Sequence, residues 1–119
     1  MTAVSQIVKV RHAGETYDAI KIWCPGCEAL AEDGMKSGGL HMLPISGETG
    51  HHPVWKWNGD LVKVTLSPSI LTRYVLEDKQ FVCHSFLRDG VWEFLNDCTH
   101  SLAGQKVPMS PLPLWVLDR

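Results

Sequence analysis

The sequence predicts a mostly β fold, with a small α+β fold as the alternative, in which zinc-ribbon-like β-hairpins are joined by long ordered loops. Short segments rich in β-branched and aromatic residues alternate with turn residues, as is typical of strands. The pairs Asn58-Gly59 and Asp89-Gly90 are strong hairpin signals. Cys24-Pro25-Gly26-Cys27 has the form of a zinc knuckle, which aims two thiolates at one ion.

Composition limits the size of the fold and its classes of partner. The 119 residues leave room for one modest core, so we expect a single zinc-binding domain over residues 1–119. On it we expect an N-terminal segment, 1–16, and a Pro-rich tail, 106–119, to pack. Eleven Lys and Arg residues against thirteen Asp and Glu residues give a net charge of −2, which argues against nucleic acid as a partner.

The first strand is expected at residues 17–23, which run directly into Cys24. Residues 28–39 are rich in glycine and charge and allow at most one helical turn. A second strand at 40–45 is short or lies at a sheet edge, because it contains Pro44.

Two hairpins are expected in the second half of the chain. Residues 54–57 and 61–66 flank the Asn58-Gly59 turn, and 70–76 is either a strand or a turn of helix. The clearest hairpin joins 81–87 to 91–95. The tail is expected to be extended and pinned by apolar residues, Leu112, Leu114 and Trp115.

Hairpin geometry selects among the candidate metal ligands. With Arg88 opposite Val91, Ser85 faces Phe94, Cys83 faces Asn96, and Cys83 shares a strand face with Trp92 and Phe94. Because successive side chains alternate, His84 points to the other face. We therefore predict zinc held by four ligands, Cys24, Cys27, His41 and Cys83. Cys98 is a close alternative to His41 as the fourth ligand. Two other interpretations are that the knuckle has a redox role and that the cysteines are simply buried in the core.

A second polar group is expected on the opposite face of the hairpin. His84 and Asp97 lie diagonally across it, and His100 follows just after the strand. The group is interpreted as a binding site, either a catalytic pair or a set that orients a metal ligand. A third interpretation is that Asp97 caps the turn that follows it, with its carboxylate accepting backbone N–H bonds. The segment Ser67-Pro68-Ser69 is interpreted as a structural turn, because it lacks a Gly-x-Ser-x-Gly elbow or a lysine three residues on. His12, His51 and His52 are assigned no role.

Six motifs in order resemble a family of small proteins of unknown function, encoded largely by bacteriophages and prophages. They are Trp-Cys-Pro-Gly-Cys (23–27), Gly-Leu-His (39–41), Trp-x-Trp-Asn-Gly-Asp (55–60), Leu-Ser-Pro-Ser-Ile (66–70), Cys-His-Ser-Phe-Leu-Arg-Asp-Gly (83–90) and Asp-Cys-Thr-His-Ser-Leu-Ala-Gly-Gln (97–105). Some members carry the label ammonia monooxygenase, which conflicts with a chain that has no apolar span of about 18 residues. The resemblance implies a phage accessory protein.

The functional expectation is therefore a zinc-stabilised phage accessory protein. It would act in the cytoplasm of the bacterial host by binding a host or phage protein, since no signal peptide is seen at the N terminus. One alternative is a small zinc-dependent hydrolase that uses His84, Asp97 and His100 to move protons. The other is a module that binds single-stranded nucleic acid through the knuckle and an exposed Trp55 or Trp57. The sequence leaves open whether the protein is an enzyme.

Overall fold

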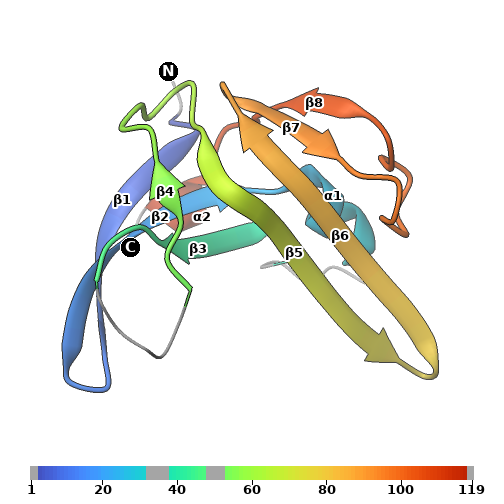
Figure 1. Cartoon of the computed structure of the whole chain (residues 1–119), viewed down its shortest axis with the longest axis horizontal. Helices are drawn as coiled ribbons and strands as arrows, with labels where there is room; N and C mark the ends of the chain where they lie inside the picture. Colours follow the sequence, from blue (N-terminus) through green and yellow to red (C-terminus); the bar gives the residue numbers. More distant parts are fainter. Residues whose placement is uncertain (1–2, 32–37, 48–52, 118–119) are drawn as a thin grey trace.

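Two antiparallel sheets make up the protein, which confirms the mostly β prediction. The computed structural model describes residues 3–31, 38–47 and 53–117 (Figure 1). The first sheet has the order β1-β2-β3 and consists of β1 (Ser5–His12), β2 (Glu15–Trp23) and β3 (Leu40–Pro44). The second has the order β4-β5-β6-β7-β8 and consists of β4 (Lys56–Trp57), β5 (Leu66–Leu76), β6 (Lys79–Arg88), β7 (Val91–Phe94) and β8 (Lys106–Pro108). The helices are α1 (Pro25–Leu30) and α2 (Leu114–Leu117).

The first sheet contains one strand more than expected. β2 and β3 lie where the apolar patterning placed them, but β1 falls within the N-terminal segment, for which no strand was predicted. β1 pairs with β2 over its whole length, from Ser5 opposite Ile22 to His12 opposite Glu15. Ala13 and Gly14 close this hairpin with φ values of 53° and 81°. Ala13 is a poor residue for a left-handed turn, so the turn gave no signal in the sequence.

The predicted hairpin of β6 and β7 has the expected register. Arg88 lies opposite Val91 and Ser85 opposite Phe94. The expected pairing of Cys83 with Asn96 does not form, because regular pairing ends at Phe94. The chain nevertheless stays beside β6, since the Leu95 N–H donates to the carbonyl of His84 at 2.9 Å.

The prediction of a strand at residues 61–66 is wrong except at Leu66, where β5 begins. Side chains replace it with a turn: Asn58 Oδ1 accepts the Thr65 N–H, and Asp60 Oδ1 accepts the N–H groups of Lys63 and Val62. These hydrogen bonds from Lys63 and then Val62 hold the pKa of Asp60 below its ordinary value. Asx turns of this kind compete with strand pairing.

β5 is one long strand with an irregularity at the segment interpreted as a turn. The register passes from Leu66 opposite Leu87 to Ile70 opposite Ser85, so three residues, 67–69, oppose Phe86 alone. Such bulges re-aim side chains. Residues 70–76, predicted as strand or helix, continue as strand and pair with β6 up to the turn at Glu77 and Asp78.

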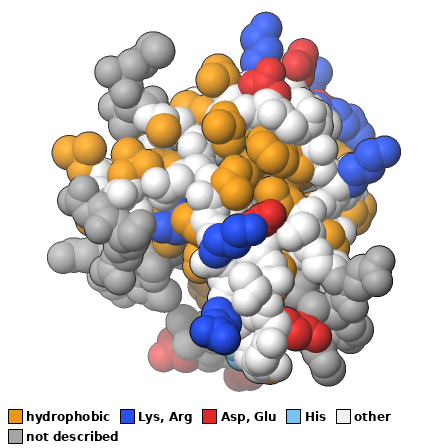
Figure 2. Space-filling view, turned by 90° about the vertical axis from the view of Figure 1, so that its left-hand side faces the viewer, with side chains coloured by type: hydrophobic (Ala, Val, Ile, Leu, Met, Phe, Trp, Pro, Cys, Tyr) orange, Lys and Arg blue, Asp and Glu red, His pale blue; other side chains and the backbone are white. Residues whose placement is uncertain are grey.

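The core is built from both sheets. Ile20 and Ile22 of β2 and Leu87 and Trp92 of the second sheet are completely buried in one cluster. Figure 2 shows the face at the left of Figure 1, where apolar side chains also reach the surface between basic and acidic ones. No helix in the described ranges is long and apolar enough to cross a membrane.

The C-terminal tail packs differently from the extended form predicted. Leu112 is buried as expected, and its N–H donates to the carbonyl of Ala3. The tail then forms α2, in which Val116 is buried and Leu114 is 72% exposed. Leu114 therefore does not pin the tail as predicted, because the helical turn points it outward and brings Val116 inward.

Candidate functional site

His84 and Asp97 form the pair that the hairpin predicted. His84 is on β6, and its Nδ1 lies 3.0 Å from Asp97 Oδ2. An ionised carboxylate can only accept hydrogen bonds, so the proton of a neutral His84 ring belongs on Nδ1. Nε2 is then left with a free lone pair, which is the state of a general base.

Ser69 completes the arrangement on the other side of the ring. Its Oγ lies 3.1 Å from His84 Nε2, so the hydroxyl can donate to the nitrogen that accepts. The bulge of β5 places Ser69 there, two residues before Leu71, the cross-strand partner of His84. Ser69, His84 and Asp97 thus have the contacts of a nucleophile, a base and a carboxylate that orients the base.

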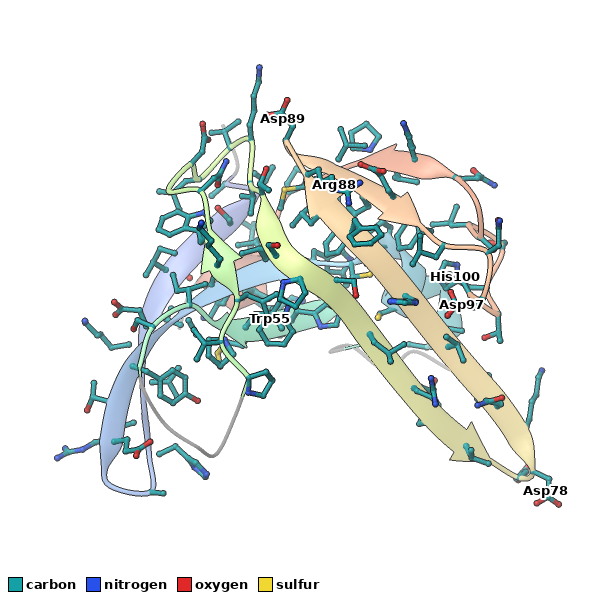
Figure 3. All side chains as sticks on the ribbon, viewed as in Figure 1. Trp55, Asp78, Arg88, Asp89, Asp97 and His100 are labelled. Carbon is teal, nitrogen blue, oxygen red and sulfur yellow. The ribbon has the colours of Figure 1, made fainter. Side chains whose placement is uncertain are left out.

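Three hydrogen bonds from two side chains hold this arrangement in place. Cys98 Sγ accepts the His84 N–H and donates to the His84 carbonyl, both at 3.2 Å. Trp55 Nε1 donates to the Ser69 carbonyl at 3.3 Å. Trp55 and Asp97 lie on opposite sides of the β5–β6 pair in Figure 3. The His84 and Asp97 side chains are 25% and 54% exposed, so a substrate can approach.

Three cysteines meet on the inner face of β6. The sulfur atoms of Cys24, Cys27 and Cys83 lie within 4.8 Å of one another, and those of Cys24 and Cys83 are 3.7 Å apart. Cys24 caps α1 by accepting the Cys27 N–H at 3.4 Å, and Pro25 occupies the first turn. All three are buried and none is in a disulfide. This cluster can hold a metal ion.

His41 is the fourth residue of the predicted ligand set. β3 brings it beside β2, and its Nε2 lies 3.3 Å from Cys27 Sγ. Ligands bound tetrahedrally at about 2.3 Å for sulfur and 2.0 Å for nitrogen are themselves roughly 3.5 to 3.8 Å apart. The Cys24 to Cys83 and Cys27 to His41 separations are close to this spacing. His41 nevertheless lies outside the group of three sulfurs whose ligand atoms are all within 4.8 Å of one another, so the structure places it beside Cys27 alone.

The pKa values of the three thiols diverge because their sulfurs contact one another, so that a thiolate on one is stabilised by the S–H groups of the others. The Cys24 thiol donates to Cys27, which holds the pKa of Cys27 far below its ordinary value and raises that of Cys24 to about 12. Contact with Cys24 likewise raises the pKa of Cys83. Three buried thiolates cannot coexist without a cation, so the cluster is suited to a positively charged ion.

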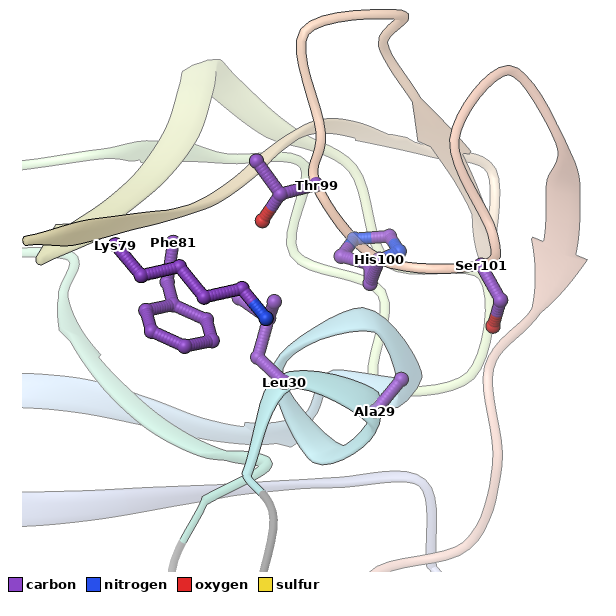
Figure 4. A pocket seen from close by; sticks show the side chains of 7 residues that line it. All are labelled: Ala29, Leu30, Lys79, Phe81, Thr99, His100 and Ser101. Carbon is purple, nitrogen blue, oxygen red and sulfur yellow. The ribbon is translucent and has the colours of Figure 1, made fainter. Parts of the chain in front are cut away.

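His100 is separated from the pair with which the sequence grouped it. It lies with Cys83 and Cys98, with ligand atoms within 4.8 Å of one another. Its Nδ1 accepts the Leu102 N–H at 3.1 Å, so the buried Nε2 carries the proton. Burial lowers the pKa of His100. A cavity of about 240 Å³ is lined by His100 and Phe81 (Figure 4). Phe81 and His84 point to opposite faces of β6.

Close packing of α1 on this cluster makes Gly26 a sensitive position. A Cβ there would lie 2.5 Å from His100 Nε2 and 2.8 Å from Cys83 Sγ. We expect Gly26→Ala to lower the free energy of unfolding by about 2 kcal/mol or more in urea denaturation, despite the higher helix propensity of alanine. Ala29→Gly, on the exposed side of α1, should cost no more than about 1 kcal/mol. A neutral Gly26→Ala would contradict the packing.

Ser69 is the residue that sequence reasoning missed. No local motif marks it, and the only signal was its position just before a strand that pairs with the His84 strand. Of the histidines assigned no role, His12 is exposed at the end of β1, while His51 and His52 lie outside the described residues.

The contacts from Ser69 to His84 and from His84 to Asp97 have the same order as those of a Ser-His-Asp triad. A family model described as bacterial ubiquitination-like system serine protease (BubE) matches residues 2–95, and the chain belongs to this family. The match includes Ser69 and His84 and ends two residues before Asp97. No significant match is found among curated proteins or among solved structures.

Proposed function

We propose that this protein is a serine protease of a bacterial ubiquitination-like system, with a zinc-stabilised fold. Ser69 is the nucleophile, His84 the general base and Asp97 the group that orients it. The observation that carries the proposal is the continuous chain of contacts, 3.1 Å from Ser69 Oγ to His84 Nε2 and 3.0 Å from Nδ1 to Asp97 Oδ2. Family membership supports the same reaction and supplies the system in which it takes place.

The proposed reaction is acyl transfer in two steps. Ser69 Oγ attacks the carbonyl carbon of a peptide bond while His84 Nε2 takes its proton, and the same proton then passes to the leaving amine. Water next attacks the acyl-enzyme, giving its proton to His84, which returns a proton to Ser69 as the ester bond breaks. Asp97 stabilises the imidazolium in both steps.

Zinc is the metal that suits the cysteine cluster. The three clustered sulfurs and one imidazole would form a donor set typical of structural zinc, and His41 is proposed as the fourth ligand because it contacts Cys27. Zinc there would supply cross-links between α1, β3 and β6 rather than a reacting group, because Cys24, Cys27 and Cys83 are each at most 5% exposed. Burial of the sulfurs therefore supports a structural role.

The other predicted functions receive less support. A zinc-dependent hydrolase would combine His84 and Asp97 with His100, but the His100 ring is turned toward Leu102 and the cysteines. Trp55 and Trp57 are partly buried and pack against the core, which limits the ring surface that they offer for stacking on nucleic acid. Phage origin, a host or phage protein partner, a cytoplasmic location and a single domain over residues 1–119 stay predictions.

Covalent labelling tests the nucleophile directly. We expect an alkyl fluorophosphonate to modify Ser69 in the folded protein and not after heat denaturation, with the site read by tandem mass spectrometry. Asp97→Asn should slow labelling by about 100-fold or more, because the amide favours the wrong imidazole tautomer. Asp89→Asn is the matched control in the exposed β6–β7 turn and should label normally. Modification elsewhere, or none, would contradict the proposal.

A further inference from the structure

One edge of β5 has no strand partner next to the candidate nucleophile. In the second sheet β5 lies between β4 and β6, but β4 pairs only with Leu66 and Ser67. From Ile70 to Leu76, β5 continues along β6 while no strand in the described part of the chain pairs with its other edge. In Figure 1 this part of β5 projects with β6 beyond the rest of the second sheet.

The pairing pattern shows which backbone groups face this edge. Glu77 and Asp78 form a two-residue turn, so Leu76 and Lys79 are a hydrogen-bonded pair. Because such pairs alternate along an antiparallel ladder, residues 71, 73 and 75 direct their N–H and C=O groups away from β6.

The far edge of β6 confirms this alternation. The cross-strand partner of Leu71 is His84, whose carbonyl accepts the Leu95 N–H, and the partner of Arg73 is Val82, whose carbonyl accepts the Thr99 N–H. These groups on β6 point away from β5, as the pattern requires. The edge of β5 therefore offers the main-chain groups of Leu71, Arg73 and Val75 to a further strand.

The composition of this edge also suits an added strand. Leu71 and Val75 are 47% and 66% exposed, and with Arg73 they lie on the same strand face as His84. Exposed edge strands with apolar side chains invite pairing with another chain, and proteins normally shorten or cover them. Here the edge begins two residues after Ser69, where a strand paired with it leads directly to the nucleophile.

We infer that the substrate binds as an extended polypeptide that adds a strand to the free edge of β5, with main-chain hydrogen bonds to Leu71 and Arg73. The inference rests on the proposed function, because it assigns the way in which that site holds the chain around the scissile bond. Pairing through the main chain accepts varied side chains and positions the peptide bond along β5 toward Ser69. The substrate segment must accordingly be unfolded or extended.

Arg73→Pro removes an outward N–H without removing a hydrogen bond between β5 and β6. The probes are an acetyl-trialanine diphenyl phosphonate, which has a peptide main chain, and an alkyl fluorophosphonate, which has none. We expect Arg73→Pro to slow inactivation by the peptide probe roughly threefold to tenfold, the effect of one hydrogen bond, and to leave inactivation by the alkyl probe unchanged. Two controls should react like the wild type with both probes: Arg73→Ala, which keeps the N–H, and Val75→Pro, which moves the same change two residues away.

Wild-type protein provides a measurement that does not depend on the variant folding. N-methylation of the peptide probe at each alanine in turn should slow inactivation at one position by a similar factor. Equal rates for all methylated probes, or an Arg73→Pro effect shared by the alkyl probe, would overturn the inference. So would a wild-type dimer, seen by light scattering, that Arg73→Pro dissociates, because a second copy would then occupy the edge. Failure of the alkyl probe to label Ser69 would instead overturn the proposed function.

Discussion

Replacing Ser69 with alanine is expected to reduce hydrolysis of an acetyl-trialanine p-nitrophenyl ester by roughly 1,000-fold or more. Without Oγ there is no acyl acceptor, and His84 Nε2 loses the hydroxyl that lies 3.1 Å away. Stability should change little, because Ser69 is only partly buried and loses one hydrogen bond. Initial rates and thermal melting measured on the same preparation check both expectations.

Ser67→Ala is the matched control for this experiment. Ser67 lies two residues earlier in the same bulge, is exposed, and pairs with Lys56 through the backbone of β4. Its variant should retain activity within about twofold, because surface substitutions of this kind rarely perturb a site. Equal losses of activity in Ser67→Ala and Ser69→Ala would point to a disturbed bulge. Activity retained in Ser69→Ala would exclude Ser69 as the nucleophile.

Two of the three residues of the candidate active site could be predicted from hairpin register. Asp89-Gly90 fixes the pairing of β6 with β7 as far as Phe94. Asp97 lies beyond this ladder, but the hydrogen bond from the Leu95 N–H to the His84 carbonyl keeps its segment beside β6, where Asp97 contacts His84. Ser69 could not be found in this way, because its position depends on a bulge in which three residues oppose one. A bulge changes the side-chain direction without leaving a residue pattern as distinct as a Gly-x-Ser-x-Gly elbow.

The cysteine cluster was predictable for a similar reason. Cys24 and Cys27 are close through a single turn, and Cys83 was placed by the strand face that it shares with Trp92 and Phe94. His100 was placed with the wrong neighbours, because it follows the end of regular pairing, where alternation no longer determines direction. Side-chain positions in local turns and regular strand pairs could therefore be predicted from the sequence. Positions in the irregular segments between them could not.

Loss of the metal is expected to lower the stability of the protein strongly. We expect purified protein to contain one zinc per chain, and chelation or Cys24→Ser to lower the melting temperature by more than roughly 15 °C, because structural zinc binding contributes folding free energy directly. Cys83 immediately precedes His84 on β6. Cys27 lies on α1, which packs against β6, and Cys24 caps this helix. Removing the metal or one of its sulfur ligands should therefore also abolish fluorophosphonate labelling of Ser69. Elemental analysis, thermal melting and fluorophosphonate labelling measure the three consequences.

Cys98→Ser is the matched control, because it makes the same substitution outside the proposed ligand set. A serine hydroxyl can still accept the His84 N–H and donate to its carbonyl, so zinc content should be unchanged and melting should shift by only a few degrees. Loss of zinc in Cys98→Ser, with zinc retained in His41→Ala, would make Cys98 the fourth ligand in place of His41. Protein without stoichiometric zinc that also melts unchanged after chelation would refute a metal-stabilised fold. A metal ion at this cluster would explain why three buried thiols converge in a chain with only a modest core, because it would join α1 to β6, the strand that carries His84.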